Sequence, residues 1–464
     1  MVEAVSKSIR LDYIRMVNFE GNITDVSNLI SEFSVYESLF SNYVTGYMVM
    51  LDNIGFLERF PIIGEEFVEL SFRTPEQKKL TYTFAIYKVE NVQNASENSN
   101  PSALFTINLV APQLIASNTT VVEDSFIGLN CSSIIESVHE TYFNRSNKKY
   151  SGQNKPYLVR TPLDVEETDG LVSIVSPMSS PFDLIQYCVK QSRSLEYPES
   201  DFVYYQDVDG FHLRTISSLM EEPAVEEYYV GEASNASKLV ANQVKIKDYQ
   251  LVTTFERVMN FDVLNRQAQG MYDNSVSSID PILKKYTESS INYADSRINF
   301  TAPNSIDKLT TKDSIHAKSP GNSHSRYLVS SLSDGDYKQE SYLDNRIELD
   351  DFTITDNNLA YPSTRYKYLP FRISKMSQLM QGLRLNLALP GNSELKVGQN
   401  INFHFPQTTA ASDEAEENFM FGRKDKSKFL ITSLNHFYNV TNDSYFTNVE
   451  ITKNGFGSRI KNRI

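Results

Sequence analysis

Six histidines are the residues of this chain best suited to bind a metal ion or transfer a proton, and their spacing supports neither role. No two of them have the spacing that places two imidazoles on one face of a helix. We therefore expect surface or core histidines, and neither a catalytic nor a metal site. The six are His139, His212, His316, His324, His404 and His436.

Acidic residues offer two further candidates, and both have a simpler explanation. Residues Asp207 to Gly210 read DVDG, like the start of a calcium-binding loop, but no glutamate follows at the position of the bidentate ligand. Strand-like sequence lies on both sides, which favours a β-hairpin turn. Glu65 and Glu66 are adjacent. Adjacent side chains of a strand point to opposite faces, so these two would not share a site.

Motifs for nucleophilic or nucleotide chemistry are missing from the sequence, which has no GxSxG, no P-loop and no GxGxxG after a strand. The two cysteines, Cys131 and Cys188, are far apart in sequence and cannot form a zinc site by themselves. Because the N-terminus lacks the apolar core of a signal peptide, we expect synthesis in the cytoplasm and reduced, buried thiols. The sequence thus predicts no enzyme and no cofactor.

Size and composition indicate a folded, acidic protein of about two to four domains. The chain has 464 residues, of which 40% are hydrophobic, and its aromatic residues are all Tyr and Phe. This composition favours strands and turns over long helices. The net charge of -14 argues against a protein that coats nucleic acid, although an acidic channel lining would let nucleic acid slide past.

Alternating patterns predict strands at both ends of the chain. Apolar and polar residues alternate there with a period of two, which is typical of strands that bury one face. Breaks such as Pro390-Gly391 separate the runs. The runs are 67–73, 82–87, 105–109, 383–389, 401–405, 429–436 and 445–451.

The middle of the chain predicts a mixed α+β region. Ser133 to Glu136 fits a capping box at a helix start. Ser180 followed by Pro181 fits a second helix start, and the apolar stripe of that helix includes Cys188. Cys188 is therefore expected in the core.

Two polar segments read as loops. Residues 301–350 are rich in Ser, Asp, Asn and Lys, so we expect them to be loop-rich and partly extended. Residues 406–428 have an acidic half and a basic half. Either this second segment is a solvated loop, or it contacts a neighbouring subunit.

The two β-rich ends share one pattern, in which an alternating strand after a glycine is followed by two further strands. Pattern alone leaves both a duplication and a chance similarity open. A duplication would give two copies of one small barrel-like domain with the mixed region inserted between them. The matching segments are 62–72, 82–92 and 104–110 at the first end, and 395–405, 429–440 and 445–452 at the second.

Several motifs in one order resemble the central baseplate hub proteins of T-even-like contractile phages. The first is the run from YESLF to PIIGEE within residues 26–75. Five more follow, and the resemblance spans roughly 26–452. They are SSPFDLIQYCVKQS (179–192), FVYYQDVDGFHLRTISSL (202–219), VLNRQAQGMYDN (263–274), LALPGNSELKVGQNINFHFP (387–406) and SKFLITSLNHFYN (427–439).

The resemblance implies an α+β, mainly β fold, with two tail-tube-like β-barrel domains and an inserted mixed α+β domain. The expected boundaries follow from it and from the patterns above. They are 1–117 for the first barrel, 118–215 for the first part of the mixed hub domain, 216–250 for a segment of the second barrel, 251–355 for the second part of the mixed domain with its insertion 301–350, 356–455 for the second barrel, and 456–464 for a C-terminal tail.

The resemblance also implies a function in the virion, at the tail baseplate. Hub proteins form homotrimers, and three two-barrel chains would present six similar barrels. Such a ring adapts a sixfold tail tube to a threefold puncturing spike and leaves a channel for DNA. The implied partners are the spike, the tail tube or its distal initiator, baseplate wedge or inner-ring proteins, and the tape measure protein.

The resemblance supplies no catalytic, cofactor or metal residue, and the residues of interest are therefore interface candidates at corresponding strand starts of the two barrels. The alternatives are a hub or spike component of a related contractile injection system, a tail-associated peptidoglycan hydrolase, and a soluble α+β binding protein. The interface candidates are Pro61, Gly64, Glu65 and Glu66 in the first barrel, and Pro390, Gly391, Gly398 and Gln399 in the second.

Overall fold

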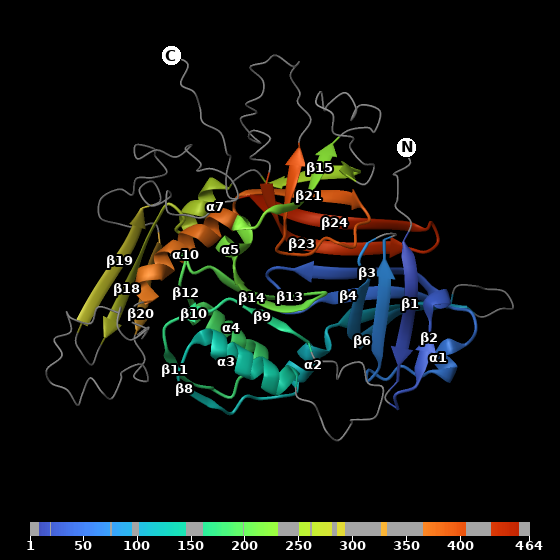
Figure 1. Ribbon diagram of the computed structural model, residues 1–464. Helices are drawn as coiled ribbons and strands as arrows, with labels where there is room; N and C mark the ends of the chain where they lie inside the picture. Colours follow the sequence, from blue (N-terminus) through green and yellow to red (C-terminus); the bar gives the residue numbers. More distant parts are fainter. Residues whose placement is uncertain are drawn as a thin grey trace, which may run out of the picture.

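A computed structural model shows two β-rich parts that lie side by side and a mixed α+β part packed against them (Figure 1). All structural statements below concern the described residues. These are 9–18, 20–74, 77–94, 102–144, 161–197, 199–230, 250–259, 262–280, 285–292, 326–331, 365–404 and 428–453.

The first β-rich part, which we call set one, comes from the N-terminal end of the chain. Its strands pair antiparallel in the order β3-β4-β7-β6-β5-β1-β2. Strand β2 leads through a 3-10 turn into β3, and the N–H of Val26 donates to the carbonyl of Ile14 in β1. The elements are β1 (Arg10–Val17), β2 (Ile23–Asp25), η1 (Ser27–Leu29), β3 (Ile30–Ser38), β4 (Thr45–Asp52), α1 (Phe56–Arg59), β5 (Phe67–Arg73), β6 (Leu80–Asn94) and β7 (Ala103–Val110).

The second β-rich part, set two, is assembled from two distant stretches of sequence. Its order is β17-β21-β24-β23-β22-β15-β16, and β16 runs directly into β17. Residues 251–259 were expected in the mixed domain, but strand pairing with β15 and β21 places these residues in set two. The elements are β15 (Ala224–Val230), β16 (Leu251–Val252), β17 (Thr254–Met259), β21 (Leu383–Pro390), β22 (Asn400–His404), β23 (Lys428–Asn439) and β24 (Ser444–Lys453).

Strand order matches between the two sets, with β3, β4, β7, β6, β5 and β1 corresponding to β17, β21, β24, β23, β22 and β15. The match extends to a bulge. The pairing of β6 with β7 shifts after Ile86, opposite Leu109, and that of β23 with β24 shifts after Ile431, opposite Ile451. Two pairings differ, because β15 lies parallel to both β22 and β16, whereas β1 lies antiparallel to both β5 and β2.

Hydrogen bonds repeat at the same positions. The N–H of Ile86 donates to the carbonyl of Glu66 at 3.0 Å, and the N–H of Ile431 donates to the carbonyl of Gln399 at 2.9 Å. The side chain of Glu66 accepts from the N–H three residues earlier, as does that of Gln399. The repeated pattern of the sequence therefore corresponds to a repeated arrangement of strands and bonds.

The mixed part covers one end of set one and set two with helices and small sheets. Helix α4 starts as expected, since the Ser180 hydroxyl accepts from the N–H of Asp183 and Pro181 occupies the first turn. The capping box at Ser133 is wrong, because Asn130 caps α3 by accepting from the N–H of Ser133. The elements are α2 (Pro112–Asn118), β8 (Ser125–Leu129), α3 (Cys131–Val138), η2 (His139–Phe143), β9 (Leu163–Val165), β10 (Thr168–Asp169), β11 (Val172–Val175), α4 (Pro181–Gln191), β12 (Arg193–Ser194), β13 (Phe202–Asp207), β14 (Gly210–Thr215) and α5 (Ile216–Glu221).

A small sheet of β18, β19 and β20 packs against helix α10. Strand β20 lies inside the segment 301–350, which was expected to be loop-rich and partly extended, and it pairs parallel with β18. The rest of that segment lies outside the described residues. Of the polar segment 406–428, only Lys428 lies within the described residues, as the first residue of β23. The elements are α7 (Val263–Ala268), β18 (Asp273–Asp280), β19 (Lys285–Asn292), β20 (Arg326–Ser331) and α10 (Arg365–Met380).

Tight packing at Gly391 generates a stability prediction. A Cβ atom at this position would lie 1.8 Å from Cδ1 of Tyr445, whose ring is fully buried. We expect Gly391→Ala to destabilise the fold by about 1–3 kcal/mol, measured by thermal unfolding, because the core must shift to admit the methyl group. The same change in a Tyr445→Ala background should cost much less. An equal penalty in both backgrounds would contradict the steric explanation.

Candidate functional site

The first group of interface candidates lies on the loop between α1 and β5. Pro61, Gly64 and Glu65 are exposed there, beside Ile63, whose exposed fraction is 62%. Glu66 is fully buried, and its carboxylate accepts from the N–H groups of Ile63 and Gly64 at 2.8–3.1 Å. Glu66 therefore shapes the loop from inside, while the other three form its surface.

The second group of candidates lies on the corresponding loop between β21 and β22, and it is largely covered. Pro390, Gly391 and Gly398 are buried, and Gln399 is half-buried. Gly398 has a φ of +82°, which favours glycine, and it packs against the hydroxyl of Tyr205. The two groups thus occupy matching positions in the two sets but differ in exposure.

The two sets meet at a seam, where β3 pairs antiparallel with β23 (Figure 1). Ser34 donates to Asn435 at 2.6 Å across the seam, although 401 residues separate them in sequence. Beside it, the Thr74 hydroxyl lies 2.7 Å from the hydroxyl of Ser393, so the loop after β5 covers the loop after β21. The matching loop of set one, at 61–65, has no such cover among the described residues.

Two ionisable groups are buried beside the seam. The hydroxyl of Tyr82 donates to Glu37 at 2.9 Å. Burial, aided by the negative charge of Asp207, raises the pKa of Glu37 to about 8. Burial lowers the pKa of His436 to about 3, and its Nδ1 lies 2.7 Å from the hydroxyl of Tyr445. Both groups are therefore uncharged at neutral pH.

The DVDG hairpin joins both sets to the mixed part. The carboxylate of Asp207 accepts from the N–H groups of Asp209 and Gly210, which confirms a turn between β13 and β14. The Asp209 carboxylate forms ion pairs with Lys78 of set one and Lys396 of set two. Although burial opposes its charge, hydrogen bonds from the two lysines lower the pKa of Asp209.

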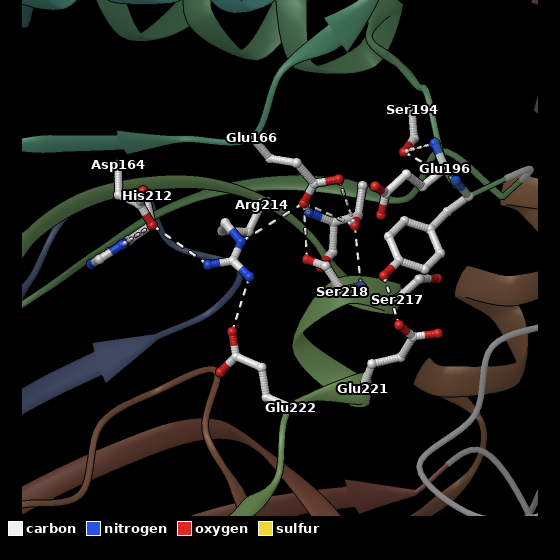
Figure 2. A network of polar contacts seen from close by, with 12 residues as sticks. Asp164, Glu166, Ser194, Glu196, His212, Arg214, Ser217, Ser218, Glu221 and Glu222 are labelled. Atoms are coloured by element: carbon white, nitrogen blue, oxygen red, sulfur yellow. Dashed lines mark hydrogen bonds and ion pairs between the residues drawn. The ribbon is translucent and has the colours of Figure 1, made fainter.

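A polar network ties α5 to the strands β9 and β14 (Figure 2). Arg214 contacts Glu222 at 2.9 Å and Asp164 at 3.5 Å. The carboxylate of Glu166 accepts from the Thr215 N–H at 2.8 Å and from the Ser218 hydroxyl at 2.9 Å. The network therefore holds the start of α5 against β9 and β14.

Titratable residues elsewhere have structural contacts. His139 is buried between Tyr204 and the carbonyl of Thr161. Both cysteines are free thiols in the core, as expected, and burial raises the pKa of Cys131 to about 11. In the part of the chain that the structure describes, no three His, Cys, Asp or Glu side chains could together hold a metal ion. No helix within those residues is long and apolar enough to cross a membrane.

The two candidate loops were predicted from the sequence, whereas the residues at the seam were not. Glu37, Asn435 and His436 lie within motifs that carry the resemblance and within alternating strands, but neither signal assigned them a place at a contact between the two ends of the chain. His316 and His324 lie outside the described residues.

Comparisons with known proteins give matches of structure alone. No protein-family model matches the sequence, and no curated protein matches it. The 43 kDa tail protein of prophage MuSo2 from Shewanella oneidensis matches with a TM-score of 0.51 and 8% identity, over 95% of this chain and 98% of that chain. The tail protein from Neisseria meningitidis MC58 matches with a TM-score of 0.50 and 8% identity, over 96% of each chain.

These matches show that the chain has the fold of the two tail proteins, mainly β with some helices. The resemblance to phage tail hub proteins drawn from the sequence is thereby confirmed at the level of the fold.

Glu37 generates a prediction about pH. Its folded-state pKa of about 8 lies above its ordinary value of 4.5, so the protonated form is the one that stabilises the fold. That contribution is complete below pH 4.5 and is lost progressively as the pH rises to 8. We expect Glu37→Gln to flatten this loss, measured by circular dichroism melts between pH 5 and 8.5. The exposed Glu394, replaced by Gln, is the control; equal pH profiles for the two variants would refute the assignment.

Proposed function

We propose that the chain is a structural subunit of a phage tail, the central hub of the baseplate, and acts without catalysis. The observation that carries the proposal is the repeat: one chain with the fold of tail proteins contains the same order of strands twice. A chain with two similar sets of strands suits a junction at which threefold and sixfold symmetry meet, because three such chains present six similar sets.

Each set of strands is proposed to form a tail-tube-like barrel. In both sets the last strand leads back to the first, through η1 in set one and through the direct continuation of β16 into β17 in set two. Set one falls within 1–117. Set two draws on 216–250, on 251–259 and on 356–455, and the remaining described elements form the mixed hub domain.

Three chains would then place six barrels around a central channel. The outer face across the seam carries neutral and acidic polar side chains from both sets. Asn435 pairs with Tyr36 on one side and with Asn448 on the other, and both of these partners are exposed. A wall of this kind suits the passage of DNA, because it offers few cations to bind phosphate. The proposed location is the tail of the virion, with the spike below and the tail tube above. Wedge or inner-ring proteins and the tape measure protein are the other proposed neighbours.

The loop at 61–65 is proposed to contact the next subunit. Within one chain, the loop after β5 covers the loop after β21 through Thr74 and Ser393. In a ring of equivalent barrels, the matching loop of set one must meet a neighbouring chain in the same way. Pro61, Gly64 and Glu65 are exposed as this requires, whereas the second group of candidates already has its contact inside the chain.

The ring itself is directly testable by electron microscopy of the tail tip or of the concentrated protein. We expect a trimer with six similar barrels around an open channel. Light scattering should give a molar mass three times that of one chain. A monomer with a closed, apolar centre would overturn the proposal.

Substitution in the exposed loop should weaken the trimer and leave the monomer stable. We expect Ile63→Asp to shift the monomer–trimer midpoint at least tenfold toward monomer, because a charge would replace a side chain buried on assembly. Thermal unfolding of the monomer should be nearly unchanged, since Ile63 is 62% exposed. Leu264, which is 78% exposed on α7, provides the matched control as Leu264→Asp. Equal effects of the two changes would count against the loop contact.

A further inference from the structure

Strand β6 is paired along only part of one edge. It is 15 residues long, and β7 pairs with it from Ala85 to Asn94. On the other edge β5 pairs with it only from Leu80 to Ala85. Among the strands that the structure describes, none lies beside the second half of β6 on that edge. A half-covered edge of this length is a ready template for another strand.

The corresponding strand of set two shows what covers such an edge. Strand β23 pairs with β22 over its first residues only, and β3 of set one occupies the rest of that edge from Ser433 to Asn439. Within the chain, the second half of β23 is therefore paired with β3 of the other set. The second half of β6 is the same position in set one, and there the structure describes no such partner.

The strand of set two that corresponds to β3 is β17. It lies at the end of set two, next to β21. In the described part of the structure β17 is recorded beside β21 alone, while β3 lies between β4 and β23. Its side chains are exposed along most of its length, and Val258 has an exposed fraction of 41%. An exposed apolar side chain on a strand at the end of a sheet is a surface that proteins normally cover.

We propose that β17 of one copy pairs antiparallel with the second half of β6 of the next copy, which rests on the proposed ring of three chains. The partner is a second copy of this chain, because the pairing repeats, between chains, the seam that β3 and β23 form within one chain. Each chain offers both edges, so three chains close a ring with one such seam at every contact.

The matching bonds fix the register of this pairing. Glu90 in β6 lies four residues after Ile86, as Asn435 in β23 lies four residues after Ile431. Because β6 pairs with β7 in the same register as β23 pairs with β24, Glu90 and Asn435 hold equivalent positions in the two sets. Met259 holds the position in β17 that Tyr36 holds in β3, since their partners Arg384 and Thr45 correspond.

Because Asn435 pairs with Tyr36 inside the chain, Glu90 should face Met259 of the next copy. Charges at this seam balance, with Lys88 and Glu90 on one strand and Glu256 and Arg257 on the other.

Cysteine cross-linking tests both the strands and the register. Facing residues of paired strands have Cβ atoms about 4.5–5.5 Å apart, close enough for a disulfide after small adjustments. We expect the variant with Glu90→Cys and Met259→Cys to form covalent trimers under mild oxidation, reversed by reductant on a denaturing gel. The native Cys131 and Cys188 are buried and should not interfere. Each single variant should stay monomeric on the same gel.

A matched control keeps one cysteine and moves the other. Asn448 is exposed on the same face but lies on β24, away from the proposed seam, so Glu90→Cys with Asn448→Cys should give no covalent trimer.

Light scattering on the same samples separates the possible failures. A trimer that does not cross-link through residues 90 and 259, or that cross-links equally in the control, would overturn the strand pairing and leave the proposed hub function standing. A chain that stays monomeric and uncross-linked at high concentration would contradict both.

Discussion

The antiparallel ladder between β3 and β23 is the interaction on which the rest of the structure depends. It joins two strands from opposite ends of the chain, and it makes one continuous sheet from the two repeats. Without it the two sets would be separate domains whose relative orientation the connecting segments could not fix. With it, main-chain hydrogen bonds set both the angle and the register of one repeat against the other.

The polar groups around this ladder add specificity to it. Glu37 and His436 are buried beside the seam in uncharged form, each with a tyrosine hydroxyl as partner. A buried polar group is tolerated only where its partners are in place, so a slipped register would leave these groups unsatisfied. Asp209 of the mixed part adds to this specificity, because its two lysine partners come from different sets. Both ion pairs can form only when set one and set two are both packed against the mixed part.

Much of the secondary structure could be predicted from the sequence, and much of the tertiary structure could not. Alternation gave the strands around Leu383 and Phe429 because each buries one face, and the Ser180-Pro181 start of α4 was also local information. The cap of α3 was missed because Asn130 and Ser133 both suit a helix start, and only the conformation of the chain decides between them.

Pairing over long separations was beyond the reach of these patterns. No local signal connects Ser34 with Asn435, and none could show that the loop at 61–65 is open while its counterpart is covered. That difference in exposure arises from which strand lies beside which. The sequence motifs therefore located the candidate interface, and the exposed half of it emerged only from the tertiary contacts.

Carrying the strand arrangement twice in one chain also changes how a closed ring would accumulate. The seam between β3 and β23 forms during folding, at an effective concentration set by the chain itself. A ring of three such chains has half of its contacts complete before any subunits meet, and its yield rises with about the third power of concentration, against about the sixth for separate single-repeat subunits. Fusion of the two repeats would thus favour closure of such a ring at low protein concentration.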